Sequence, residues 1–364
     1  MHFAQKLLSS VAVAALTLVV PAAAQSLEQM AGQMIVVGFQ GDGVDDKSVV
    51  ALRREIAAGE IGGVMFLKLN VSSLKAVTAM NAAFRDASPQ LPPFLTLDQE
   101  GGAVERLTEA VGFKEIPSAE TVATRNAPAA AEALYADLAR KIAALGFTVN
   151  FGPVVDLDSN PKNQIIAKYG RAFGKTAAAV IPYAEGFVKA HRSAGVLTAL
   201  KHFPGHGSST ADSHEGFVDI TRTWKPEELE PYATLIGEGL ADFVMVGHLI
   251  DTDYSTLPAS LAPEWITGVL REQLGYEGVV ISDDLEMGAI REHFGLRETV
   301  TRAVRAGMDV LLFSNTAKYR ASLGDEIRAI LVSEAETDPA FKALIEASYA
   351  RIVALNGRIA LEIG

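Results

Sequence analysis

The chain has 364 residues, of which 49% are hydrophobic and 21% are charged, and this composition excludes disordered and fibrous proteins. The formal net charge of −12 at pH 7 argues against nucleic acid as a partner, because phosphate backbones attract basic surfaces. The sequence contains no cysteine, which excludes disulfides, thiolate zinc sites and a cysteine nucleophile.

The first 24 residues have the pattern of a secretory signal peptide: Lys6 lies in a short polar start, residues 7–20 are apolar, and three alanines follow Pro21. The apolar run is shorter than the roughly 20 residues that a membrane-spanning helix needs. An uncleaved anchor or a buried helix is the alternative. We expect cleavage after Ala24 and export to the periplasm or the medium, without integral membrane association. Removal of Lys6, the only charged residue of this segment, leaves 31 basic and 44 acidic residues, a net charge of −13.

Eight short apolar runs follow in chain order and predict strands that are buried on both faces, at residues 34–38, 61–67, 94–97, 147–151, 196–200, 242–246, 278–281 and 308–313. Apolar stripes with helical spacing lie between them, at about 48–58, 72–86, 129–145, 176–193, 229–236, 263–274 and 296–306. Glycines that separate a helical stripe from the next strand indicate helix C-caps, at Gly146, Gly195, Gly275 and Gly307.

This alternation predicts an α/β fold of one domain, residues 25–364, built as a (β/α)8 TIM-type barrel. Two further helices are expected outside the barrel, near 317–332 and 338–357. An open, doubly wound sheet is the alternative, since strand counts from one sequence can be wrong by one or two. No oligomeric state follows from the sequence.

Polar residues gather directly after the predicted strands, where the loops of such a barrel build its active site. Ionisable groups next to buried strands cost free energy unless they are paired or used, so a site is expected there. Carboxylates with basic groups suit hydrolysis of a glycosidic bond. These residues are Asp98, Glu100, Asp156, Asp158, Lys201, His202, His248, Asp283, Asp284, Ser314 and Asn315.

Metal-assisted hydrolysis is the alternative chemistry, with His202, His206, His214 and His248 as candidate ligands. The four-residue spacing of His202 and His206 places both on one face only in a helix. The Pro-Gly pair between them, residues 204–205, argues against a helix. We therefore expect no metal site and no organic cofactor.

Two long motifs carry a resemblance to a known family: KHFPGHGSSTADSH at 201–214 and GVVISDDLEMG at 278–288. LDQEGG at 97–102, NFGPVVDLDSNPKN at 150–163 and RAFG at 171–174 support it in the same order. The chain resembles the family 3 glycoside hydrolases, and within them the β-N-acetylglucosaminidase branch. The resemblance spans essentially the whole chain after the signal peptide.

The resemblance implies that Asp283 is the catalytic nucleophile and that His214 is the general acid and base, with Asp212 as its partner. An imidazole gives and takes a proton near neutral pH, and a neighbouring carboxylate orients its ring. Asp284 is the competing nucleophile. Since adjacent strand residues point to opposite sides, we expect only one of the two in the pocket and interpret Asp284 as the cap of the following helix.

The resemblance also implies that sugar hydroxyls are bound by Asp98, Arg106, Arg171, Lys201 and His202, because hydrogen bonds to charged groups are strong. A structural ion pair with a carboxylate such as Asp156 is the alternative for the two arginines. His248 is interpreted either as a pocket residue or as a hydrogen-bonded core histidine. Surface positions are expected for His191 and His293, and packing roles for Trp224 and Trp265.

The expected function is that of a retaining exo-β-N-acetylglucosaminidase acting on a small carbohydrate or muropeptide, derived from peptidoglycan. A phosphorylase of the same family, a metal-dependent barrel hydrolase and a non-catalytic sugar-binding protein are the alternatives. The sequence departs from the family pattern at Ala103, where an arginine is common, and at Glu286, where a small residue is common.

Overall fold

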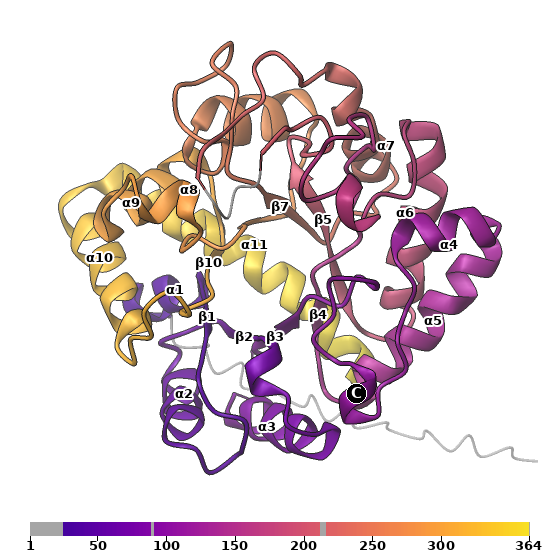
Figure 1. Cartoon of the computed structure of the whole chain (residues 1–364). Coiled ribbons are helices and arrows are strands. Elements are labelled where there is room, and N and C mark those ends of the chain that lie inside the picture. The colour runs from indigo at the N-terminus through magenta and orange to yellow at the C-terminus, as the bar shows by residue number, and fades with distance from the viewer. Residues whose placement is uncertain (1–24, 89–90, 212–215, 364) are drawn as a thin grey trace, which may run out of the picture.

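Eight parallel strands form the centre of the computed structural model, which describes residues 25–88, 91–211 and 216–363 (Figure 1). β1 pairs with β10 as well as with β2, and a bridge between Ile281 and Val310 joins β9 to the start of β10. The sheet therefore curls into a barrel, so the predicted fold is confirmed and the open sheet is wrong. The strands are β1 (Ile35–Gly38), β2 (Gly63–Phe66), β3 (Phe94–Leu97), β4 (Val149–Asn150), β5 (Leu197–Phe203), β7 (Phe243–Val246), β9 (Val279–Ser282) and β10 (Leu311–Phe313).

All residues of these eight strands are buried, which explains why their sequences are continuous apolar runs rather than alternating ones. β5 extends three residues beyond its apolar run, through Lys201 and His202 to Phe203. Its register with β7 shifts between Leu200 and Phe203. Such an irregularity re-aims side chains, and here it accompanies two polar residues in succession that both line the central pocket. A second, two-stranded sheet pairs β6 (Val218–Asp219) with β8 (Leu249–Ile250).

Helices surround the strands in Figure 1. The predicted helical stripes are confirmed within a few residues, except that the predicted helix at 317–332 begins later, at Leu323, and the last helix ends later, at Ile363. No helix in the described part of the chain is long and apolar enough to cross a membrane. The helices are α1 (Leu27–Gln33), α2 (Lys47–Ala58), α3 (Leu74–Ala87), α4 (Ala119–Arg125), α5 (Pro128–Ala144), α6 (Ala177–Arg192), α7 (Glu230–Gly237), the π-helix η6 (Glu264–Gln273), α8 (Gly288–Arg291), α9 (Leu296–Ala306), α10 (Leu323–Thr337) and α11 (Pro339–Ile363). Short 3-10 turns are η1 (Lys68–Asn70), η2 (Glu109–Val111), η3 (Ala167–Tyr169), η4 (Pro226–Leu229) and η5 (Ala259–Leu261).

Helix ends follow the local sequence signals. Ser73 accepts a hydrogen bond from the Ala76 N–H at the start of α3, as an N-cap serine does. Gly307, directly after α9, has φ of 111°, and Gly195 after α6 has φ of 72°. Side chains other than hydrogen rarely tolerate this left-handed conformation, so the glycines end these helices where the sequence predicts.

α11 closes the end of the barrel at which the strands begin, and in Figure 1 it passes behind them. Arg351 of α11 binds Asp309, two residues before β10, at 2.9 Å. Arg358 of α11 binds Asp242, directly before β7, at 2.8 Å. Both carboxylates are fully buried. The candidate active site lies at the opposite end of the barrel, where the strands finish.

Candidate active site

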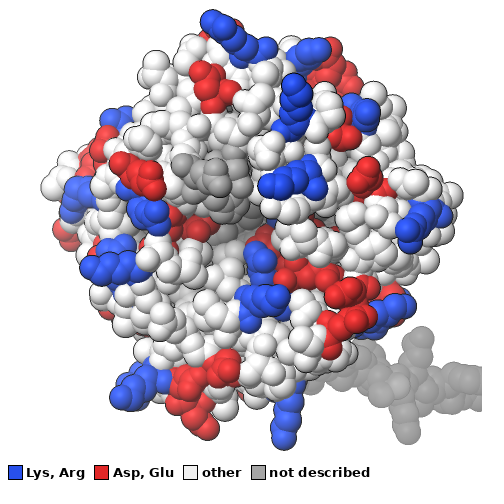
Figure 2. Space-filling view, viewed as in Figure 1, with Lys and Arg blue, Asp and Glu red and all other residues white. Residues whose placement is uncertain are grey.

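A cavity of about 350 Å³ lies at the ends of the barrel strands. Figure 2 shows a hollow near the middle of one face, with acidic and basic side chains at its edge. Strands β2, β3, β4, β5, β7, β9 and β10, or the residues directly after them, all supply lining groups. Apolar lining comes from Met65, Leu67, Val104, Phe151, Ile165, Met245, Met287 and Leu312, and charged or titratable lining comes from Asp98, Glu100, Arg106, Arg171, Lys201, His202, His206, Asp283 and Asp284.

Lys201 connects the two carboxylates that follow β3. Its Nζ lies 2.8 Å from Asp98 Oδ1 and 2.6 Å from Glu100 Oε1. Arg106 binds Asp98 at 2.9 Å, and Arg171 binds Glu100 through Nε at 2.9 Å and Nη2 at 2.8 Å. The two carboxylates and three cations thus form one network at the pocket wall.

The charges of this network are set by their partners. Burial favours the neutral acid, but Lys201 and Arg106 outweigh it and hold the pKa of Asp98 below its ordinary value. Burial likewise opposes ionisation of Glu100, and Arg171 and Lys201 overcome it, so its pKa is also lowered. Burial lowers the pKa of Lys201, while Asp98 and Glu100 raise it to a net increase. All three groups are therefore charged at neutral pH, and their hydrogen bonds to a polar ligand are of the strong, charge-assisted kind.

Asp156 holds the histidines of the 201–206 segment. Its Oδ2 lies 2.7 Å from His202 Nδ1, and its Oδ1 accepts the His206 N–H at 2.7 Å. Burial raises the pKa of Asp156, but His202 outweighs burial and the net change is a decrease. An ionised Asp156 accepts a hydrogen bond from Nδ1–H of His202, so the other ring nitrogen, Nε2, faces Arg171 at 3.4 Å from Nη2. The pKa of His206 falls to about 4, because burial and then His202 disfavour its charged form.

Asp283 stands at the end of β9 and lines the pocket. Its own N–H donates to Val246 O at 2.9 Å, which continues the ladder with β7, and the Asp284 N–H donates to Asp283 Oδ1 at 2.8 Å. These contacts fix both the backbone and one carboxylate oxygen at the rim of the barrel.

Asp284 differs from its prediction in two ways. It lines the same pocket as Asp283, so the expectation that only one of the pair faces it is wrong. It also does not cap the next helix, because α8 has Met287 at its N-cap position. Its Oδ1 instead accepts the N–H groups of Glu286 at 3.0 Å and Ser314 at 2.8 Å, which ties the loop after β9 to the end of β10. Burial raises the pKa of Asp284.

The structure brings together six of the residues predicted for the site: Asp98, Arg106, Arg171, Lys201, His202 and Asp283. The two arginines also form the ion pairs offered as their alternative, but with Asp98 and Glu100 rather than with Asp156. The predicted catalytic residues Asp212 and His214 lie outside the described residues.

Sequence reasoning placed Glu100 and Asp156 among the polar residues after the strands but assigned neither of them a role in the site. Glu100 lies two residues after Asp98 in the motif at 97–102, and this spacing on one strand end was the available signal for it. Asp156 lies 46 residues before His202 in the chain, so the contact between the two is visible only in the fold.

Other predicted residues have structural contacts. His248 is fully buried, with Nδ1 2.8 Å from Ser260 Oγ and Nε2 2.8 Å from Asp284 O, so it fits the core alternative. The surface position predicted for His191 is wrong: it is fully buried, bonds Phe187 O and contacts Asn150 Nδ2 at 3.0 Å. The surface position of His293 is confirmed.

Both tryptophans pack as predicted. Trp265 is fully buried against Phe203, and Trp224 donates its ring N–H to Pro204 O at 3.0 Å. Neither ring lines the central pocket. Within the described residues, no group of three or more His, Asp and Glu side chains is arranged to hold a metal ion.

Comparison with known proteins gives a consistent result. Residues 26–355 match the model of the glycosyl hydrolase family 3 N terminal domain. Beta-hexosaminidase A of Pseudoalteromonas piscicida is 30% identical over 327 residues, 84% of this chain but 54% of that protein, so the chain spans about half of this relative. Beta-hexosaminidase of Xylella fastidiosa strain M23 is 34% identical over 288 residues, 77% of this chain and 82% of the relative.

Among solved structures, a glycoside hydrolase family 3 beta-N-acetylglucosaminidase from Paenibacillus sp. str. FPU-7 superposes with a TM-score of 0.84. It is 30% identical, and the match covers 94% of this chain and 64% of that one. The likeness therefore extends over nearly the whole barrel described above.

Proposed function

The chain belongs to glycosyl hydrolase family 3, and from this membership we propose that it is a β-hexosaminidase that releases terminal β-linked N-acetylglucosamine by hydrolysis. The names of its relatives and of the matching solved structure support this activity. The pocket supports it independently, because its volume of about 350 Å³ and its charged wall suit a single hydroxyl-bearing ring.

The observation that carries the proposal is the place of Asp283. It stands at the rim of β9 in the same cavity as the Asp98, Glu100, Arg106, Arg171 and Lys201 network. In the proposed reaction this network binds the outer hydroxyls of the sugar, and the Asp283 carboxylate attacks the anomeric carbon. The attack forms a covalent glycosyl-enzyme with retention of configuration after hydrolysis.

His214 supplies the proton in this proposal, with Asp212 as the group that orients its ring. The support is the sequence motif at 201–214 and the chemistry of imidazole, whose ordinary pKa near 6.5 permits it to protonate the leaving oxygen and then to activate water. The His202 to His206 part of the same motif lies against Asp156 at the pocket wall.

The first experiment measures hydrolysis of a chromogenic β-N-acetylglucosaminide by the wild type and by Asp283→Asn. Loss of the carboxylate removes the nucleophile, so we expect kcat to fall on the order of 10³-fold or more. Asp253→Asn, at an exposed loop position, is the matched control and should retain full activity. Full turnover by Asp283→Asn excludes the proposed mechanism.

Mass spectrometry tests the covalent intermediate directly. A fluorinated glycosyl fluoride that keeps the 2-acetamido group should label a peptide that contains Asp283. Label on Asp284 would reassign the nucleophile to the neighbouring residue. No label, together with inverted product stereochemistry by NMR, would contradict a retaining mechanism.

The alternatives differ in what they require. A phosphorylase turns over faster with added phosphate and releases a sugar 1-phosphate. A metal-dependent hydrolase loses activity with chelators, whereas the proposed mechanism predicts no change. A non-catalytic binding protein shows affinity for the sugar without turnover.

We further propose that the protein is exported and that its substrate is derived from peptidoglycan. The support is the signal-peptide pattern of the first 24 residues. Cell fractionation with N-terminal sequencing is the test, and a mature chain that begins at Gln25 in the periplasm is the expected result. A full-length chain in the cytoplasm would contradict it.

A further inference from the structure

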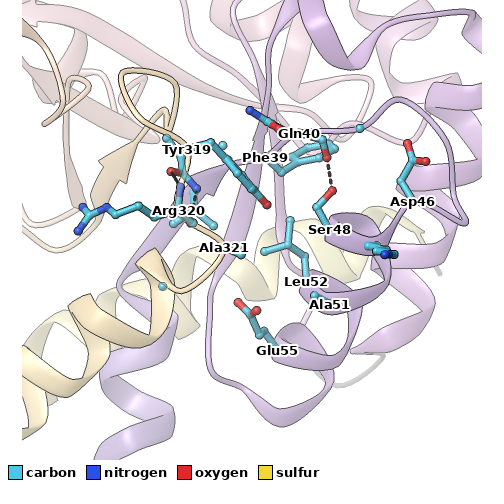
Figure 3. Close-up of a pocket in the computed structure, with 16 residues that line it drawn as sticks. Phe39, Gln40, Asp46, Ser48, Ala51, Leu52, Glu55, Tyr319, Arg320 and Ala321 are labelled. Carbon is cyan, nitrogen blue, oxygen red and sulfur yellow. Dashed lines mark hydrogen bonds between the residues drawn. The ribbon is translucent and has the colours of Figure 1, made fainter.

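A second cavity, of about 510 Å³, lies beside the active-site cavity between α2, α10 and the end of β1 (Figure 3). The segment 314–316 separates the two: Ser314 and Thr316 line the active-site cavity, and Asn315 lines the second one. The proposed reaction uses none of the residues that line this second cavity.

Most polar groups of its wall are engaged within the protein. Asp46 Oδ2 accepts the N–H groups of Asp42 at 2.8 Å and Gly43 at 2.9 Å. Arg320 binds Glu326 at 2.7 Å. The Asn315 side chain bonds both the N–H and the C=O of Arg320 at 2.9 Å. Ser48 donates to Gln40 O (Figure 3). These groups build the wall and are already satisfied.

Glu55 on α2 differs from them. Its side chain lines the cavity (Figure 3), is half-buried, and makes no hydrogen bond or ion pair with any side chain or backbone group in the described parts of the chain. Burial, and after it the nearby carboxylates of Asp325 and Glu60, raise its pKa to about 7, although Arg328 acts in the opposite direction.

Arg328 does not neutralise Glu55, because it is already bound to Glu60 at 3.1 Å and to Asp325 at 2.8 Å. Tyr319 lines the same cavity. Glu55 therefore lies near the carboxylates of Asp325 and Glu60 without an ion-pair partner of its own, an arrangement that costs free energy. A cation placed in the cavity would remove that cost.

The apolar part of the wall comes from Leu52 and Ala51 of α2, Val37 and Phe39 at the end of β1, and Ala321. Lys47, eight residues before Glu55 on α2, also lines the cavity. We propose that this cavity is a second binding site, for a small ligand that carries a primary ammonium group on an apolar body. Glu55 binds the ammonium group, and Leu52, Ala51 and the Tyr319 ring contact the apolar part. The site is independent of the proposed hydrolase reaction.

The test is an NMR titration of the protein with n-butylammonium, with n-butanol as the neutral ligand of the same shape. The wild type should bind the ammonium and not the alcohol. Its affinity should increase as the pH rises through 7, because Glu55 binds the cation only when ionised, and binding should release a proton. Glu55→Gln should weaken ammonium binding roughly tenfold or more and abolish its pH dependence.

Two variants separate this site from others. Ala51→Leu fills the cavity but keeps the carboxylate, and it should also lose ammonium binding. Both variants should hydrolyse the chromogenic substrate at the wild-type rate, since neither residue lines the active-site cavity. Glu55→Gln should unfold at the same or a higher temperature than the wild type at pH 8, which shows that reduced binding is not a folding defect.

Several results would overturn the proposal: no saturable binding of n-butylammonium by the wild type, equal binding of the alcohol, unchanged affinity in Glu55→Gln, or unchanged affinity in Ala51→Leu. None of these bears on hydrolysis. Conversely, an inactive wild-type enzyme that binds n-butylammonium through Glu55 would reject the proposed function and leave this site in place.

Discussion

Arg171 binds Glu100 through two nitrogen atoms, and the geometry of that pair makes its side chain hard to replace. Lysine keeps the charge but offers a single point of contact. We predict that Arg171→Lys lowers the free energy of unfolding by about 1–3 kcal/mol and raises KM, because Glu100 then loses one of its two contacts with this cation and is held less firmly. Denaturant unfolding and steady-state kinetics measure both.

Arg302→Lys is the matched control, because Arg302 pairs with Glu298 at 2.9 Å on an exposed helix face. Exposed pairs contribute little, so its effect should stay within about 0.5 kcal/mol. Equal stability of the two lysine variants would show that the bidentate contact at Glu100 has no special weight.

Glu228 is a buried carboxyl whose pKa is raised by the fold. It is 3% exposed, and its Oε2 accepts the Gly207 N–H at 3.2 Å, at the segment that carries His206. Burial raises its pKa to about 7. Between pH 4.5 and 7 the folded protein keeps a proton on Glu228, whereas the unfolded chain has lost it. Protonated Glu228 therefore contributes its full stabilisation of the fold below about pH 4.5, and this contribution is lost as the pH rises to about 7.

Glu228→Gln keeps an acceptor oxygen but cannot ionise. We predict that it removes a pH-dependent loss of stability on the order of 2–3 kcal/mol between pH 5 and 8. Urea unfolding at several pH values measures this, with Glu227→Gln, an exposed neighbour, as control. Parallel stability curves for wild type and Glu228→Gln would contradict the raised pKa.

For the residues of the candidate active site, the sequence predicted which ones line the pocket better than it predicted which side chains contact each other. Asp98, Lys201 and Arg171 were found through motifs, and all three line the pocket. Which carboxylate faces which cation depends on strand register, so Glu100 was missed as the partner of Arg171. His191 was placed on the surface, because a helical stripe does not reveal that a polar ring bonds to the neighbouring helical turn and to Asn150.

Charged residues at the strand starts also hold elements of the fold together. Asp309, before β10, binds Arg271 of η6 at 2.6 Å and Arg351 of α11 at 2.9 Å, and it accepts the Val280 N–H from β9 at 2.8 Å. One buried carboxylate therefore links two strands and two helices.

We predict that Asp309→Ala lowers the free energy of unfolding by about 3–5 kcal/mol, because it leaves buried donors and a half-buried guanidinium without an acceptor. Arg351→Met should cost less, since Arg271 still neutralises Asp309 and Arg351 is one-third exposed. Chemical denaturation of both variants gives the comparison. A larger effect for Arg351→Met would contradict the central role of the carboxylate.

Strands and helices were predictable where the sequence contains a complete apolar run or a complete apolar stripe. The apolar runs located all eight barrel strands, since strands buried on both faces are mostly apolar. α1, α4 and α8, at seven, seven and four residues, were missed, because so short a segment does not complete an apolar stripe. β5 was predicted too short, because Lys201 and His202 look like loop residues until the pocket that accepts them is known.

The stability of the whole barrel depends on α11, which covers the end of the barrel at which the strands begin. Ile345, Ile352, Leu355 and Ile359 of this helix are buried in the main core, and α11 contacts α1, α9, α10 and β9. We predict that deletion of residues 339–364 exposes the barrel interior and abolishes soluble expression or cooperative unfolding. Expression yield and binding of a hydrophobic dye measure this. Glu346→Ala, an exposed change on the same helix, should leave both unchanged.

The shared ion pairs of the pocket also set a rule for recombination between homologues. Lys201 comes from β5, while Asp98 and Glu100 follow β3, so a crossover placed between these strands draws the two sides of the network from different parents. Chimeras divided there should be functional only when both parents carry the same charges at these positions. Crossovers after β5 inherit this lysine-linked set intact and should be tolerated more often.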